Sequence, residues 1–275
     1  MRRIRALLAA IPLALAGCGS VSHERTGGIV STNPCADATL VELVPPERIT
    51  AISSYSRDPR ATSMPLDVAR RFPTTSGTAE EVIALRPALV LASDFTPPST
   101  LSAYRRAGLR TLVLPISPSL AASEQQVMQI ARAVGEIPRG QALVAHMRRA
   151  VAAAKPSYTE REPEALLFLS GNLANGAGTL LDEMMRRAGL RNGAARFGLA
   201  VTNDITNEAL LAHPPQAILS AENSSRPAHL RRAMFAASGA RVKDIPFPGS
   251  LMNCGGPVVI PAMARLAEIR RGLQP

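Results

Sequence analysis

Short, continuously hydrophobic runs alternate along the chain with amphipathic segments of helical spacing. Residues 88–92 and 111–114 form two such runs, which have the length of a strand and no polar face. Runs of this kind are typical of parallel strands that helices cover on both sides. The same reasoning predicts short strands at residues 28–31, 48–52, 165–169, 217–220 and 242–245. The hydrophobic pattern therefore predicts an α/β protein with mostly parallel sheets.

The segments between these runs carry apolar residues at helical spacing. Helices are expected at residues 37–43, 123–134, 179–188 and 258–270. Ser123 is the expected N-cap of the second helix, and Gly135 its C-terminal stop. The longest helical pattern covers residues 138–155 and ends at Pro156. At 1.5 Å per residue, about 18 residues make a rod of roughly 27 Å, which is long enough to cross between two lobes.

An internal repeat divides the chain. Residues 78–91 align without gaps on residues 206–219. Each copy reads as a Thr-capped short helix, a Pro that ends it and a buried strand. The two copies stand on either side of the long helical segment, so we expect two α/β lobes, each with a central, mostly parallel sheet, joined by a single long α-helix. We place the first lobe at residues 28–136, the linker helix at 137–156 and the second lobe at 157–275.

The first 17 residues have the pattern of a signal peptide. Three arginines precede an apolar stretch, residues 6–16, that is too short to span a bilayer. The segment ends in Leu15-Ala16-Gly17-Cys18, which resembles the lipobox of bacterial lipoproteins. This resemblance implies a lipid on Cys18, a tether over residues 18–27, and an exported protein held at the periplasmic or cell-envelope membrane. The alternative is an ordinary signal peptide with a chance cysteine.

Charge and composition narrow the possible ligands. The 31 Lys and Arg residues exceed the 21 Asp and Glu residues, which gives a formal charge of +10. Removal of residues 1–17 would leave 10 − 3 = +7. The arginines are spread as pairs over amphipathic segments, which favours solvated helix faces and gives no support for a nucleic-acid partner. Aromatic residues make up 3% of the chain and Trp is absent, so a ligand site has few rings for stacking.

The order of these features resembles the substrate-binding proteins of ABC importers for iron complexes, haem and vitamin B12. The resemblance rests on the opening segment, both copies of the repeat, the long helix and a Gly-rich helix start, at residues 29–37, 80–91, 138–155, 176–192 and around 208. It implies two lobes on one long helix and a monomer without a cofactor. It also implies capture of an iron complex, either a siderophore or haem, with a cobalamin or other corrinoid as the alternative, and delivery to a membrane permease with its ATPase.

In this class each lobe presents a surface glutamate to arginines of the permease. The matching motif positions are Glu80 and Glu208, one in each copy of the repeat. A pair of acidic points on a basic protein would set the orientation of docking. The alternative for each residue is a capping-box partner at the start of its short helix.

Ligands of α/β lobes lie outside the carboxyl ends of the strands, which places several loops in the cleft between the lobes. The candidate ligand-binding residues are Asn33, Cys35, Tyr55, Arg57, Phe95, Asn172, Asn175 and Asn253. Arg57 could pair with an anionic group of a ligand, or with Asp58 or Asp94. Three possibilities stay open for Cys35 and Cys254: a disulfide across the lobes, two buried thiols, or thiolates that contact a metal-bearing ligand.

Motifs for other chemistries are few. The four His residues are scattered, so a metal site in the cleft is not expected. The chain lacks the G-x-S-x-G, H-E-x-x-H and P-loop motifs, which indicates a protein that is not an enzyme. Residues 176–180 offer backbone N–H groups to an anion, or simply close a loop before a helix. An exported enzyme of unknown chemistry is the alternative from another functional class.

Overall fold

The computed structural model describes residues 27–157, 162–221 and 225–274. The predicted signal peptide, the lipid-bearing Cys18 and all of the tether except Gly27 lie outside these residues. Within these ranges, no helix combines the length and hydrophobicity that a transmembrane span requires.

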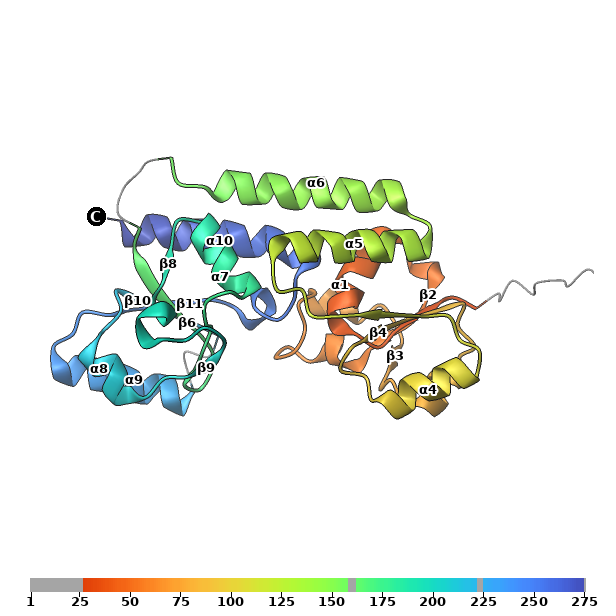
Figure 1. Cartoon of the computed structure of the whole chain (residues 1–275), viewed down its shortest axis with the longest axis horizontal. Coiled ribbons are helices and arrows are strands. Elements are labelled where there is room, and N and C mark those ends of the chain that lie inside the picture. Colours follow the sequence, from red (N-terminus) through yellow and green to blue (C-terminus); the bar gives the residue numbers. More distant parts are fainter. Residues whose placement is uncertain (1–26, 158–161, 222–224, 275) are drawn as a thin grey trace, which may run out of the picture.

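The first lobe is built on a five-stranded, fully parallel sheet with the strand order β3-β2-β1-β4-β5 (Figure 1). Its strands are β1 (Ile29–Ser31), β2 (Ile49–Ser53), β3 (Thr74–Thr75), β4 (Leu89–Ser93) and β5 (Thr111–Leu114). Its helices are α1 (Pro34–Leu43), α2 (Leu66–Ala69), α3 (Ala79–Ala84), α4 (Pro98–Arg106) and α5 (Leu120–Val134), with short 3-10 turns at Pro46–Arg48 and Ser54–Arg57. The predicted run at residues 88–92 is therefore the inner strand β4, and the run at residues 111–114 is the edge strand β5.

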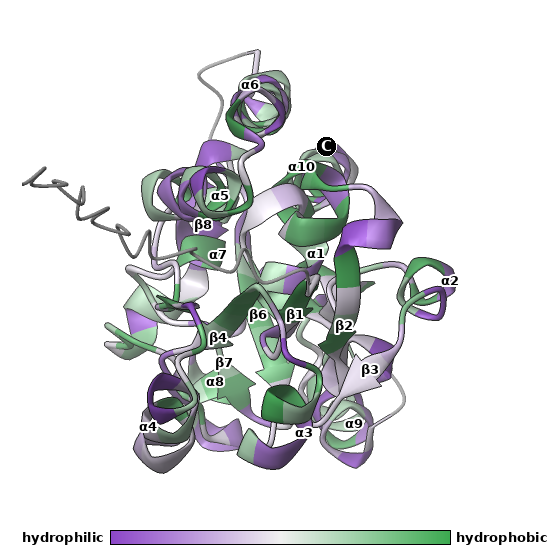
Figure 2. Cartoon of the chain, turned by 90° about the vertical axis from the view of Figure 1, so that its right-hand side faces the viewer, coloured by the Kyte–Doolittle hydropathy of each residue, from purple (hydrophilic) through white to green (hydrophobic). Residues whose placement is uncertain are grey.

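Alternate residues of each strand enter two separate cores, because successive side chains of a strand point to opposite faces. Ile29 and Leu91 pack with α1 and α5 on one face. Val30 and Val90 pack with α3 and α4 on the other, where Tyr104 is fully buried. Helices thus cover both faces of the sheet (Figure 2), which is why the inner strands β1 and β4 are almost entirely apolar.

The second lobe contains a six-stranded sheet with the order β11-β10-β6-β7-β9 and β8 beside β6. β7 runs antiparallel to β6 and β9, and the other pairs are parallel. The strands are β6 (Glu164–Ser170), β7 (Leu173–Ala174), β8 (Arg191–Asn192), β9 (Asn203–Asp204), β10 (Ala217–Ser220) and β11 (Lys243–Pro246). The helices are α7 (Leu180–Arg187), α8 (Asn207–Ala212), α9 (Arg226–Ser238) and α10 (Val259–Leu273), with 3-10 turns at Gly193–Phe197, Gly249–Leu251 and Gly256–Val258.

The long helix α6 (Ile137–Ala154) runs along both lobes and lies over α5 and α10 (Figure 1). Near its start, Arg139 donates a hydrogen bond of 3.0 Å to the carbonyl oxygen of Leu43 in the first lobe. Further along, Val144, Met147 and Ala154 are buried in the core of the second lobe. The predicted α/β fold with two lobes on one long helix is confirmed.

The internal repeat is structural. Thr78 caps α3 by accepting a hydrogen bond from the backbone N–H of Glu81, and Thr206 caps α8 in the same way. One cap prediction is wrong: the N-cap of α5 is Ser119, whose side chain accepts from the backbone N–H of Ala122. Ser123 is buried one turn later and bonds to the second lobe instead. The sequence analysis also did not anticipate the helices α2, α4 and α9 or the short strands β3, β7, β8 and β9.

Candidate functional site

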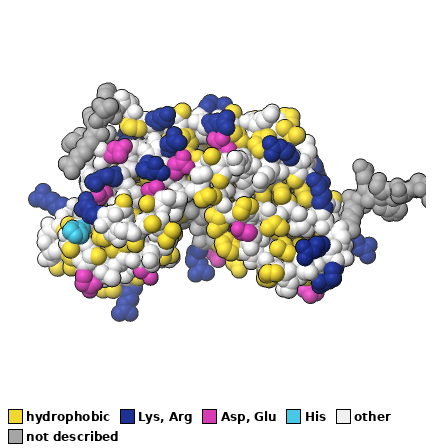
Figure 3. All heavy atoms as spheres, viewed as in Figure 1, with side chains coloured by type: hydrophobic (Ala, Val, Ile, Leu, Met, Phe, Trp, Pro, Cys, Tyr) yellow, Lys and Arg dark blue, Asp and Glu magenta, His cyan; other side chains and the backbone are white. Residues whose placement is uncertain are grey.

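A cavity of about 780 Å³ lies between the two lobes. All five strands of the first lobe end at it, because the carboxyl ends of parallel strands meet at one edge of the sheet. The first lobe supplies residues 32–35, 55, 76–77, 93, 95–97, 114–118 and 126. The second lobe supplies residues 169, 175, 178–181, 202 and 252–255. Hydrophobic side chains gather along the facing sides of the lobes (Figure 3).

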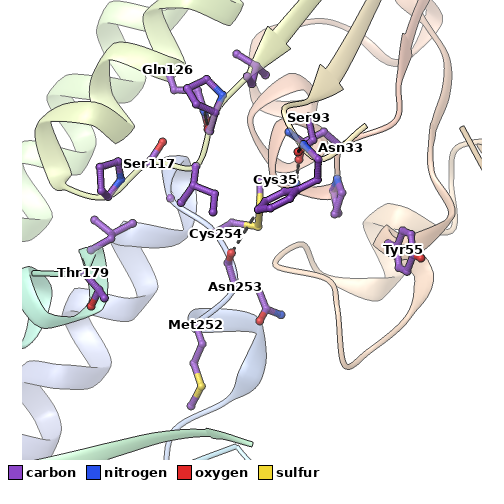
Figure 4. A pocket seen from close by; sticks show the side chains of 18 of the residues that line it. Asn33, Cys35, Tyr55, Ser93, Ser117, Gln126, Thr179, Met252, Asn253 and Cys254 are labelled. Atoms are coloured by element: carbon purple, nitrogen blue, oxygen red, sulfur yellow. Dashed lines mark hydrogen bonds between the residues drawn. A yellow bond between two sulfur atoms is a disulfide. The ribbon is translucent and has the colours of Figure 1, made fainter. Parts of the chain in front are cut away.

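The lining is uncharged. Among the described residues that line the cavity there is no Asp, Glu, Lys, Arg or His. The polar groups are hydroxyls and amides, and several lie in the view of Figure 4, including Ser93, Ser117, Gln126 and Thr179. The cavity therefore combines an apolar wall with neutral hydrogen-bonding groups, an arrangement that is typical of small-molecule sites.

Six of the eight candidate residues from the sequence line this cavity: Asn33, Cys35, Tyr55, Phe95, Asn175 and Asn253. Tyr55 and Phe95 are 60% and 74% exposed, so their rings stand free for contact with a ligand. Ile116, which is 63% exposed, adds a third large apolar side chain from the same lobe. The first lobe thus offers most of the free apolar surface.

The three asparagines already have structural partners. The Asn33 side chain caps α1 by accepting from the backbone N–H of Cys35 at 3.0 Å. Asn175 is 2% exposed, and its amide accepts from Thr179 Oγ1 at 2.9 Å. Asn253 donates from Nδ2 to the carbonyl oxygen of Arg60 at 3.3 Å. These residues shape the wall as well as present polar groups to it.

Arg57 and Asn172 lie outside the cavity lining. The Arg57 guanidinium donates to the carbonyl oxygen of Phe72 at 2.5 Å and forms no ion pair with Asp58 or Asp94 among the described residues. Asn172 lies in the tight turn between β6 and β7, where its Oδ1 accepts from Arg231 at 3.2 Å. Each side chain is therefore directed away from the cleft by a contact within its own lobe.

Cys35 and Cys254 form a disulfide, with their Cα atoms 5.2 Å apart (Figure 4). The bond joins the first turn of α1 to the segment that leads into α10. That segment also docks on the first lobe directly, since the backbone N–H of Gly256 donates to Ser123 Oγ at 2.6 Å. Gly256 has a φ of +68°, and a Cβ there would lie 2.6 Å from Thr39 Oγ1, so glycine is required at this position.

The buried carboxylic acid Asp37 lies in α1, next to the segment 32–35 that lines the cavity. Asp37 is fully buried in α1, and its Oδ2 accepts from the backbone of Ser53 at 2.9 Å and from Ser56 Oγ at 2.6 Å. Its Oδ1 has no hydrogen-bond partner among the described residues. Burial raises the pKa of Asp37 to about 7, and hydrogen bonds from Ser31, Ser56 and Ser53 lower it only in part.

The sequence analysis did not single out Thr32, Ser76, Ser117, Gln126, Thr202 and Met252, whereas Thr179 belongs to the Gly-rich helix start that it did name. Ser117 could have been found, because it follows the predicted strand 111–114 at the same edge. Gln126 could not, since it lies inside α5 and is turned to the site by its bond of 2.7 Å to the carbonyl oxygen of Pro115. At the Gly-rich helix start, the N–H groups of Ala177 and Gly178 already bond to Leu199 and Asp182, which supports loop closure over anion binding.

No group of three or more His, Cys, Asp or Glu residues arranged to hold a metal ion occurs in the described part of the chain.

Comparison with known proteins agrees with this architecture. A cobalamin-binding protein of Halobacterium salinarum is 23% identical over 252 residues, which cover 87% of this chain and 68% of that protein. The structure of a periplasmic haem-binding protein from Pseudomonas aeruginosa is 23% identical to this protein, with a TM-score of 0.68. The match covers 89% of this chain and 92% of the haem-binding protein. The structure of the periplasmic vitamin B12-binding protein of Vibrio cholerae is 18% identical, with a TM-score of 0.68. That match covers 90% of this chain and 98% of the B12-binding protein. Residues 29–238 match the periplasmic binding protein family, and the chain belongs to that family.

Proposed function

We propose that this protein is the extracytoplasmic substrate-binding component of an ABC importer. It captures a metal-containing macrocycle between its lobes and delivers it to a membrane permease and its ATPase, without catalysing a reaction. The family and the inter-lobe cavity of about 780 Å³ support this function. We further propose that the protein acts as a monomer and that a lipid on Cys18 holds it at the membrane.

The observation that carries our choice of ligand is the uncharged cavity lining. Haem carries carboxylates, and many ferric siderophore complexes are anions, so burying either would call for Arg or Lys partners. A corrinoid is surrounded by neutral amide side chains, which match the hydroxyls and amides of the wall. A corrinoid such as cobalamin is therefore the ligand that the site supports best, and the similarity to a cobalamin-binding protein favours the same choice.

An iron complex is the second candidate, and one residue favours it. Tyr55 presents a phenol at the rim of the cavity and is 60% exposed. A phenolate oxygen is a ligand for ferric haem iron in proteins. The similarity to haem-binding proteins of the same fold is consistent with this alternative.

A titration panel separates the two ligands. Cyanocobalamin, haemin and a ferric hydroxamate are each titrated into the full chain and followed by calorimetry and by the absorbance of the ligand. We expect binding of cyanocobalamin that the Tyr55→Phe variant retains within about twofold. Haemin binding that Tyr55→Phe abolishes would instead identify the iron-complex function. Absence of binding by all three would contradict the importer function itself.

We also propose that Glu80 and Glu208 dock on the permease. Both are exposed and form no ion pair or side-chain hydrogen bond with the described residues. The capping-box alternative fails on geometry, because the partner position is one residue later in each helix, at Glu81 and Ala209. Glu81 instead holds Thr75 and Ser76.

The docking proposal is tested by the charge reversals Glu80→Lys and Glu208→Lys in one chain. Ligand affinity should be unchanged, since neither residue lines the cavity, while uptake by cells should be lost. The matched control reverses the exposed Glu42 and Glu47, which lie outside the repeat, and should transport normally. Normal uptake by the Glu80→Lys/Glu208→Lys variant would refute the assignment.

A further inference from the structure

Charge is distributed unevenly over the first lobe. The helices α3 and α4 pack against each other, and each begins next to cavity residues and runs away from them. Four arginines lie at or just beyond the far ends of these helices, before the strands β4 and β5 begin. We call them the basic edge: Arg86, Arg105, Arg106 and Arg110.

The basic edge has no acidic partner among the residues that the structure describes. All four arginines are exposed, and none forms an ion pair with a described residue. Only Arg106 has a side-chain bond, of 2.9 Å to Ser102 Oγ. The acidic residues of the same unit, Glu80, Glu81 and Asp94, lie at the opposite, cavity end. The unit from α3 to β5 is thus basic at one end and acidic at the other.

The described chain begins at this same edge. The backbone N–H of Ala88 donates to the carbonyl oxygen of Gly27 at 3.2 Å. A Cβ on Gly27 would clash with the carbonyl oxygen of Arg86, so the two backbones are in direct contact. Figure 3 shows Lys and Arg side chains gathered at this end of the first lobe. A segment that precedes Gly27 therefore joins the protein among these arginines.

The tether proposed above adds a limit on distance. Cys18 stands nine residues before Gly27, and nine extended residues span at most about 30 Å. A lipid on Cys18 would hold the basic edge within that distance of a bilayer. Because surface charges act over roughly 8–10 Å at physiological salt, the edge would come within reach of charged headgroups.

We propose that the basic edge rests on the surface of a bilayer rich in anionic phospholipid. Exposed arginines are attracted to such a surface, and a cluster that forms no ion pair with the described residues keeps its charge for that contact. The cavity lies at the opposite edge of the same sheet and stays open to ligand in this orientation. Docking through Glu80 uses the cavity end of α3, so the membrane contact and the permease contact are alternative orientations of the first lobe.

The test uses the full chain with Cys18→Ser, so that no lipid is attached, and phospholipid vesicles of two compositions. One contains 30% phosphatidylglycerol in phosphatidylcholine, and the other phosphatidylcholine alone. An edge variant carries R86Q, R105Q, R106Q and R110Q. A control variant loses the same charge through R149Q, R226Q, R241Q and R271Q, four exposed arginines elsewhere on the molecule. Residues 1–26 are identical in all three proteins, so their contribution cancels.

We expect the edge variant to bind the anionic vesicles at least tenfold more weakly than the parent chain, and the control variant to stay within about threefold. The difference should vanish at 0.5 M salt and on phosphatidylcholine vesicles. Equal losses by both variants, or no loss by the edge variant, would overturn the proposal. Retention on a soluble polyanion without vesicle binding would assign the edge to a different partner and also overturn it. Corrinoid titration of the same proteins reports on the proposed function separately.

Discussion

The disulfide between Cys35 and Cys254 closes a loop of 219 residues, and its removal is the most quantitative test of the structure. We consider the double variant Cys35→Ala/Cys254→Ala, which removes the bond without leaving a free thiol. In the chain-entropy model, a loop of this length restricts the unfolded chain by about 5 kcal/mol at 25 °C. For a protein of this size, about 5 kcal/mol corresponds to a decrease in Tm of roughly 10–20 °C.

The assay is calorimetry and guanidinium unfolding of three samples: the oxidised wild type, the wild type in excess reductant, and the double variant. The reduced wild type keeps both sulfur atoms, so its loss of stability reports the bond alone. The double variant loses, in addition, the packing contacts of the Cys254 sulfur atom, because this side chain is 6% exposed. A decrease of less than about 1 kcal/mol in the reduced wild type would refute the entropic reasoning. It would mean that the reduced, unfolded chain retains structure that already keeps the two cysteines close together.

Three further predictions concern single side chains. Because the Asp37 carboxyl ionises near pH 4 in the unfolded state and near pH 7 in the native state, the free energy of unfolding of the wild type should decrease as pH rises between these values. Asp37→Asn should therefore gain about 2–3 kcal/mol over the wild type between pH 5 and pH 8, and an equal difference in urea unfolding at both pH values would contradict this. Gly256→Ala should lower the free energy of unfolding by about 1–3 kcal/mol because its Cβ would meet Thr39 Oγ1 at 2.6 Å, whereas Gly272→Ala, in a helix with open space around it, should be neutral or stabilising in the same assay. Met147→Ala should lower the free energy of unfolding by about 2–5 kcal/mol, measured with urea, because this side chain of α6 is 1% exposed in the core of the second lobe.

Sequence patterns were sufficient for the fold where local signals and burial agree. The repeat carries its caps, its prolines and its buried strands in one stretch, so both copies could be read without the structure. The helix α4 is harder, because its residues are mostly polar and only Leu101 and Tyr104 pack inward. Its periodicity is too weak to separate it from a loop. The helix α9 is similar, since Ala228 and Phe235 are its only buried hydrophobic residues.

Some residues of the candidate site could likewise be predicted from the sequence, and others could not. The rule that ligands lie at the carboxyl ends of strands placed six of the eight candidates on the cavity. It misplaced Asn172 because β6 continues to Ser170 and turns at once into antiparallel β7, so the loop does not open toward the cleft. It misplaced Arg57 because a backbone carbonyl group, which no sequence pattern marks, captures the guanidinium.

The lobes are joined at a second place besides α6, which limits how far they can rotate apart to admit a ligand. With α6 alone, the lobes could rotate about one helix. The disulfide and the hydrogen bond from Gly256 to Ser123 join α10 to the first lobe as well, and α10 packs along α6. Opening by a large rotation would have to break this docking, because Cys254 and Val258 are buried in the first lobe's core. The exposed rings of Tyr55 and Phe95 are therefore already in place before a ligand arrives, and the site is largely preorganised. Small-angle scattering with and without ligand should differ little, and reduction of the disulfide should increase the difference.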